Sequence, residues 1–131
     1  MKRAFQIVLV FSNLVPLITG TLVALNGASF FFPGQVVATD FAAQVRVYAI
    51  WFTAVFFLCV WIARNVEISG PVNRIVFTLM PLAGASRLYT MASLGDFPPS
   101  VVAGSVIEMA TIVFIPWHTF VLRSLDHTVA R

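Results

Sequence analysis

Two arginines and one glutamate stand out in this chain, because each lies inside a different long apolar stretch. They are Arg46, Arg87 and Glu108. Ionisable side chains are costly within a membrane, so their presence at that depth indicates a functional site. A guanidinium binds carboxylates, phosphates and other oxygen-rich groups, and a carboxyl group can donate or accept a proton. The three residues therefore predict ion pairing, the binding of a polar ligand, or proton transfer.

The stretches that hold these residues have the length of transmembrane helices. The chain has 131 residues, of which 60% are hydrophobic and 10% charged, and its mean hydropathy is +0.94. A helix that crosses a hydrocarbon core of ~30 Å needs ~20 apolar residues. Four segments meet this requirement, roughly residues 4–25, 41–63, 75–94 and 101–122. We therefore expect an all-α fold, an integral membrane four-helix bundle that forms a single domain over residues 1–131.

Basic residues flank these spans on one side of the predicted membrane. The first and third connectors contain no lysine or arginine, whereas the other connector and both ends of the chain do. Basic residues near helix ends favour the cytoplasmic side, so we expect both termini to be cytoplasmic. The formal charge of +3 then reflects topology and contact with anionic lipid, and requires no nucleic-acid partner. The residues that carry this argument are Lys2, Arg3, Arg64, Arg74, Arg123 and Arg131.

Helical rise predicts that the three charged residues share one layer in the outer half of the bundle. At ~1.5 Å per residue, Arg46 lies ~8 Å below the outer surface, and Arg87 and Glu108 lie ~10 Å below it. Tyr48 and Tyr89 fall near this level, so we include them with the three charged residues as ligand-binding candidates. Small residues mark helix contacts in lipid. Four of them share helix faces with the charged residues and indicate that the charges point inward: Ala49, Gly84, Gly104 and Ser105. Gly20 belongs to a similar stripe of small residues on the first span.

The charge of this layer leaves three interpretations open. If all three groups are ionised, the layer carries one unpaired positive charge, which costs ~3 kcal/mol at that depth. Asp40 or Asp96 at the outer rim, a lipid phosphate or a ligand could neutralise it. In the structural interpretation, Arg46 extends toward lipid phosphate while Arg87 and Glu108 lock two helices together. The second is a ligand-binding cavity open to the outer face, and the third is catalysis with Glu108 as general acid or base.

Cysteine and histidine are too sparse for the common cofactor sites. Cys59 is the single cysteine, which rules out an intrachain disulfide and a thiolate cluster. Only His118 lies at membrane depth, whereas a bis-histidine haem needs two facing imidazoles. We therefore expect neither a metal nor another cofactor.

The chain resembles small bacterial four-helix membrane proteins of unknown function that are related to the DoxX and DoxD-like group. The resemblance covers nearly the full length, although Ala83 stands where a second glycine is expected. It implies a multi-pass protein of the bacterial inner membrane with a four-helix fold, and it supplies no reaction. The matching features are Pro16-x-x-x-Gly20, Asp40 followed by Arg46-x-Tyr48, Gly84-x-x-Arg87, Gly95-x-x-Pro98 and Glu108.

Two functions from different classes fit these observations. The favoured one is a binding or accessory protein that holds a polar-headed lipophile, such as a lipid or a quinone, or docks to a larger membrane complex or a second copy. The alternative is a small membrane enzyme that uses Glu108 for proton transfer on a lipophilic substrate, with both arginines stabilising negative charge. No histidine, cysteine or serine nucleophile accompanies Glu108, so the sequence favours binding over catalysis.

Overall fold

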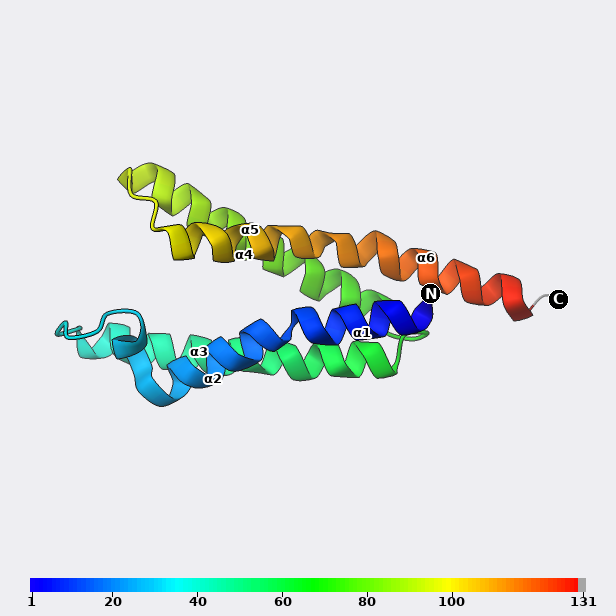
Figure 1. Cartoon of the computed structure of the whole chain (residues 1–131), viewed down its shortest axis with the longest axis horizontal. Helices are drawn as coiled ribbons and strands as arrows, with labels where there is room; N and C mark the ends of the chain where they lie inside the picture. The colour runs from blue at the N-terminus through cyan, green and yellow to red at the C-terminus, as the bar shows by residue number, and fades with distance from the viewer. Residues whose placement is uncertain (130–131) are drawn as a thin grey trace. The chain divides into compact units, whose positions relative to one another are not determined.

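The structure, a computed structural model, describes the backbone of residues 1–129 and the side chains of residues 1–125. All its regular elements are helical, and within residues 1–129 there is no strand (Figure 1). The α-helices are α1 (Lys2–Ser12), α2 (Leu14–Asn26), α3 (Thr39–Arg64), α4 (Gly70–Leu94), α5 (Pro99–Ala110) and α6 (Phe114–Val129), and the short 3-10 helices are η1 (Gly27–Phe30) and η2 (Thr111–Val113).

These elements form four helical segments that are long and apolar enough to cross a membrane. They are Lys2–Phe30, Thr39–Arg64, Gly70–Leu94 and Pro99–Leu125, and each predicted span falls inside one of them. Only 17 to 28% of the most apolar window of each segment is buried, so the remaining apolar surface suits lipid. The all-α class and the multi-pass membrane character are thereby confirmed. The orientation of the termini stays a prediction, and Arg131 lies outside the described residues.

Prolines interrupt the first and fourth segments, which the predicted spans treat as continuous. A proline has no N–H and its ring collides with the carbonyl four residues earlier. Pro16 therefore disturbs the helix at Ser12, and α1 ends there while α2 begins at Leu14. The side chain of Asn13, at the break, donates a hydrogen bond to the carbonyl of Leu9 at 2.8 Å. Pro116 acts in the same way on Ile112, which lies in η2.

The chain divides into two compact units. The first unit is residues 6–64, and the second unit is residues 1–5 together with the chain from Asn65 onward. In the first unit, α2 and α3 run side by side in opposite directions (Figure 1). They approach closely at Gly20, because a Cβ atom there would collide with the hydroxyl of Thr53 and lie 2.9 Å from the carbonyl oxygen of Ala49. Glycine is the residue that permits this approach.

In the second unit, α4 packs against α5, η2 and α6 in an antiparallel hairpin (Figure 1). Gly95 ends α4 in the left-handed conformation, with φ at 68°, which glycine adopts without strain. The aromatic core includes Phe77 and Phe114, whose rings lie 4.8 Å apart. Phe5 adds an edge-to-face contact with Trp117 at 5.7 Å. The start of α1 thus belongs to the hairpin formed by the second half of the chain.

Candidate ligand-binding site

Arg87 and Glu108 form an ion pair between α4 and α5. The Nη1 atom of Arg87 donates a hydrogen bond to Oε1 of Glu108 at 2.8 Å. A charge-assisted bond of this length is among the stronger hydrogen bonds in proteins. The structure therefore brings together two of the three charged residues singled out in the sequence, and Arg87 has the partner that the structural interpretation assigned to it.

The pair can form because α4 and α5 approach each other closely at Gly84, one helical turn before Arg87. Gly84 precedes Arg87 by one turn, and a Cβ atom added to it would lie 2.6 Å from the carbonyl oxygen of Ser105 and 3.2 Å from Cβ of Glu108. Residues three or four apart share a helix face. Gly84 and Arg87 therefore meet Ser105 and Glu108 along the same seam.

The two partners of the ion pair differ sharply in exposure. The side chain of Glu108 is 7% exposed, whereas that of Arg87 is 45% exposed. Oε1 of Glu108 receives the guanidinium, while Oε2 is buried and has no hydrogen-bond partner in the described part of the chain. Glu108 therefore acts as a covered anchor, and Arg87 presents the accessible face of the pair.

Neighbouring hydroxyls on α5 and η2 are already engaged with their own helix. Ser105 donates to the carbonyl of Val101 at 2.9 Å, and Thr111 donates to the carbonyl of Glu108 at 2.6 Å. Beside the guanidinium, Gly104 leaves room: a Cβ atom there would meet only Nη1 of Arg87, at 4.0 Å. Free donors at this site therefore come from the guanidinium.

Arg46 is a residue of α3 in the first unit, and its side chain reaches the C-terminal end of α2. Its guanidinium covers Gly27, where a Cβ atom would lie 3.0 Å from Nε and 3.1 Å from Nη2. Gly27 is the C-cap of α2, with φ at 65° and ψ at −150°. The last carbonyls of a helix carry partial negative charge and favour a nearby cation. Arg46 is thus placed where backbone dipoles stabilise it, and among the described residues it has no carboxylate within ion-pair distance.

The two tyrosines lie on exposed surfaces of separate units. Tyr48 is 67% exposed and Tyr89 is 77% exposed. Tyr89 follows Arg87 by two residues, a spacing that turns two side chains to different faces of a helix. Their contribution to ligand binding stays a prediction.

A second polar cluster, which the sequence did not single out as a group, lies near the α3–α4 connector. Nε2 of His118 is 2.8 Å from the carbonyl oxygen of Val66 and 3.3 Å from the hydroxyl of Ser69. Asn73 donates to the carbonyl of Phe114 at 3.2 Å. These polar side chains are at most 3% exposed, and they tie the connector to α6. The sequence around these residues indicates only the start of α4, through Gly70 and Pro71.

The connector is also held by the first residues of the chain. Lys2 pairs with Glu67 through Nζ and Oε1. The hydrogen bond from Lys2 keeps the pKa of the exposed Glu67 carboxyl below its ordinary value. This pair lies at the surface, where single ion pairs add little to stability. Its main effect is to hold the N-terminal residues beside the connector, and it contributes little to the free energy of unfolding.

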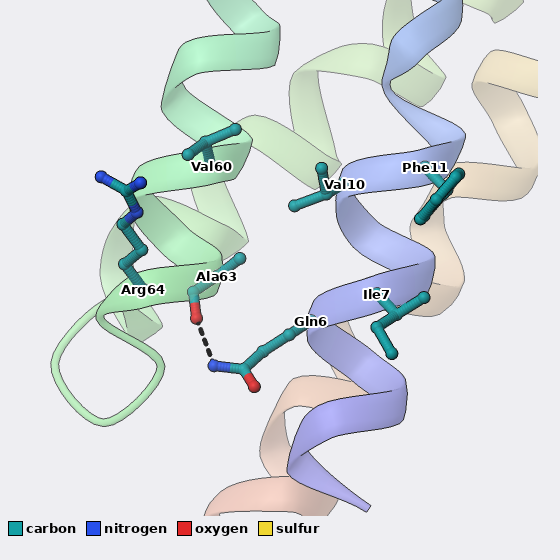
Figure 2. A pocket seen from close by; sticks show the side chains of 7 residues that line it. All are labelled: Gln6, Ile7, Val10, Phe11, Val60, Ala63 and Arg64. Atoms are coloured by element: carbon teal, nitrogen blue, oxygen red, sulfur yellow. Dashed lines mark hydrogen bonds between the residues drawn. The ribbon is translucent and has the colours of Figure 1, made fainter.

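The first unit contains a shallow groove of about 320 Å³ between α1 and α3. Its walls are mostly apolar, and Val10 and Val60 face one another across it (Figure 2). Nε2 of Gln6 donates to the carbonyl of Ala63 at 2.6 Å, which closes one end. Arg64 borders the groove, but its side chain extends away from α1 (Figure 2). The groove therefore lacks a charged group that faces into it.

Comparison with known proteins identifies the family. A model described as a domain of unknown function (DUF4345) matches residues 4–118. No curated protein and no solved structure matches the chain.

Proposed function

We propose that this chain, which belongs to the DUF4345 family, is a multi-pass membrane protein that binds the polar head of a lipophile at Arg87. Glu108 anchors the guanidinium from within the helix pair. One observation carries this proposal: the 2.8 Å bond joins a carboxylate that is almost covered to an arginine side chain that is 45% exposed.

The chemistry of arginine supports a binding role at this site. A guanidinium has five N–H donors and no acceptor. Nη1 donates one N–H to Glu108 and is also the guanidinium atom nearest to Gly104, so its second N–H is the donor closest to that open space. A head group with oxygen acceptors fits there, while its apolar tail would lie along the lipid-facing helices.

The chain's partners and location belong to the same proposal. Exposed aromatic side chains on α3, including Trp51 and Phe57, offer surface for lipid, a second copy or a larger membrane complex. The motifs around Arg87 and Pro16 support a bacterial inner-membrane protein distantly related to the DoxX and DoxD-like group. The burial of Glu108 favours an anchoring role for it over proton transfer with a substrate.

Native mass spectrometry of the purified full chain tests the proposal. Lipophiles that co-purify with the wild type are compared with those of Arg87→Gln and of the double variant Arg87→Gln/Glu108→Gln, which removes the guanidinium without leaving a buried carboxylate unpaired. We expect both variants to lose at least nine-tenths of a bound species. The matched control is Arg64→Gln, because Arg64 is exposed and has no ion-pair partner among the described residues. Equal lipophile content in all four proteins would contradict the proposal.

A further inference from the structure

The charge balance of the ion pair limits which head groups the site accepts. Arg87 and Glu108 neutralise one another through the 2.8 Å bond. The other ion pair within the described residues joins Lys2 and Glu67 near the α3–α4 connector, so it does not contribute charge to this site. A neutral ligand leaves the Arg87–Glu108 site neutral, whereas an anion gives it a net negative charge. Net charge at membrane depth is strongly unfavourable.

The hydrogen-bonding capacity of the site points in the same direction. The exposed guanidinium supplies only donors, and the hydroxyls of Ser105 and Thr111 are used by their own helix. Oε2 of Glu108, the remaining acceptor of the pair, is buried. The accessible surface therefore calls for a ligand that accepts hydrogen bonds and need not donate any. A carbonyl oxygen meets this requirement without a charge.

We infer that the Arg87–Glu108 site takes an uncharged, carbonyl-bearing head group and discriminates against anionic lipophiles of the same chain length. This rests on the proposed function. Long-chain esters and long-chain ketones share the required chemistry. The selectivity arises because Glu108 has already supplied the negative charge that would otherwise attract an anion to Arg87.

Three matched probes test this selectivity on the full chain in dodecyl maltoside micelles, because this detergent has no ester or ketone carbonyl that would compete for the site. They are methyl dodecanoate, 2-tridecanone and dodecanoate, the last at a pH where the acid is ionised. We expect at least one neutral probe to bind the wild type tenfold or more tightly than dodecanoate, and the tighter of the two identifies ester or ketone as the source. Dodecanoate that binds as tightly as both neutral probes, in a manner that depends on Arg87, would overturn the inference while leaving the proposed function intact.

Glu108→Gln supplies the sharper test because it changes the charge of the site and preserves its shape. The glutamine carbonyl can still accept from Nη1, but the site then carries one positive charge. We expect the preference to reverse, so that dodecanoate binds this variant at least tenfold more tightly than it binds the wild type. An unchanged preference would contradict the inference.

Two further variants separate the inference from the proposal on which it rests. Arg87→Gln/Glu108→Gln should lose affinity for all three probes, while Arg64→Gln should behave as the wild type does. If the double variant keeps every affinity, the proposed function fails as well. If no probe binds the wild type, the inference fails, and the co-purification experiment decides the proposed function. Helical circular dichroism and the unfolding midpoint of each variant establish that it is folded before binding is compared.

Discussion

At the scale of single residues, the two members of the ion pair make different demands on the fold. Glu108 is covered and Arg87 is half exposed. Loss of one partner is most costly when the other remains charged and buried. An exposed guanidinium can instead extend its long side chain toward polar surroundings. The exposure of each partner therefore predicts which substitution the fold tolerates.

Replacing Arg87 should destabilise the protein more than replacing Glu108. Arg87→Gln leaves a buried carboxylate without its cation, with an expected cost of about 3 kcal/mol. Glu108→Gln leaves an exposed cation that still donates to an amide oxygen, with an expected cost of about 1 kcal/mol. Unfolding in a single detergent measures both free energies. The double variant should be more stable than Arg87→Gln, and a greater loss in Glu108→Gln than in Arg87→Gln would refute the assignment of roles.

Gly27 is the residue on which the placement of Arg46 depends. Its φ of 65° and ψ of −150° lie in a region that is almost confined to glycine, where other residues pay about 1–3 kcal/mol. A Cβ atom would also press on the Arg46 guanidinium at 3.0 Å. Gly27→Ala should therefore lower the free energy of unfolding by about 2 kcal/mol or more.

Gly95→Ala is the matched control for Gly27→Ala. Gly95 also has a positive φ, 68°, but a Cβ atom there meets nothing within 4 Å. Its expected cost is the left-handed conformation alone, about 1 kcal/mol. Gly27→Ala should have the lower midpoint in thermal unfolding, because its backbone region is more restrictive than the left-handed region of Gly95 and its added Cβ atom also meets Arg46. Equal midpoints would argue against any role for the guanidinium at the end of α2.

At the scale of helices, Gly84 controls the separation of α4 and α5. A Cβ atom at 2.6 Å from a backbone carbonyl cannot be accommodated by a change of side-chain rotamer, so the helices must move apart. Overpacking of this kind typically costs about 1–3 kcal/mol. Gly84→Ala should lose that stability and also weaken the Arg87–Glu108 bond one turn away. Helix separation, measured by spin labels on α4 and α5, should increase.

Ala83→Leu is a suitable control for the Gly84 substitution. Ala83 is adjacent in the chain but exposed, so added volume there should meet lipid or detergent. We expect its free energy of unfolding to stay within about 0.5 kcal/mol of the wild type. A control as destabilised as Gly84→Ala would show that the effect arises from added volume on α4 in general.

The sequence predicts these helices well and their interruptions poorly. Apolar length alone locates all four segments, because a hydrocarbon core imposes that length. Pro16 and Pro116 are visible in the sequence, but Pro81 lies inside α4 without ending it. A proline within a transmembrane stretch is therefore compatible with either a break or a continuous helix. Local packing decides between them, and single-sequence periodicity does not report packing.

The pairing of Arg87 with Glu108 was predictable from the sequence, whereas the exposure of each side chain was not. Depth and shared faces indicate that Arg87 and Glu108 can pair, as the structure has them. The exposure of Arg87 and the burial of Glu108 depend on how α4 and α5 cross at Gly84. The position of Arg46 depends on the positive φ of Gly27, which follows from the turn after α2. Neither feature has a periodic signature in the sequence.

At the scale of the whole molecule, the basic residues of the connectors predict the orientation of the chain in the membrane. The distribution of basic residues predicts that the connector before α3 faces outward and that the connector after α3 faces the cytoplasm. Val36 and Ile68 represent these connectors, and both are exposed, Ile68 at 70%. In a Cys59→Ser background, Val36→Cys should react with a membrane-impermeant maleimide on intact cells, and Ile68→Cys only after lysis. The opposite labelling would reverse the topology.

The burial of Phe5 has a consequence for the order in which the protein is made. Phe5 is fully covered and contacts Phe114 and Trp117, which the ribosome adds more than a hundred residues later. At about 5–20 residues per second, that interval is on the order of 5–20 s. During this interval, the start of the first helix lacks the aromatic residues that cover it in the native structure. The hairpin of the second unit is therefore completed by a segment that the ribosome made long before it.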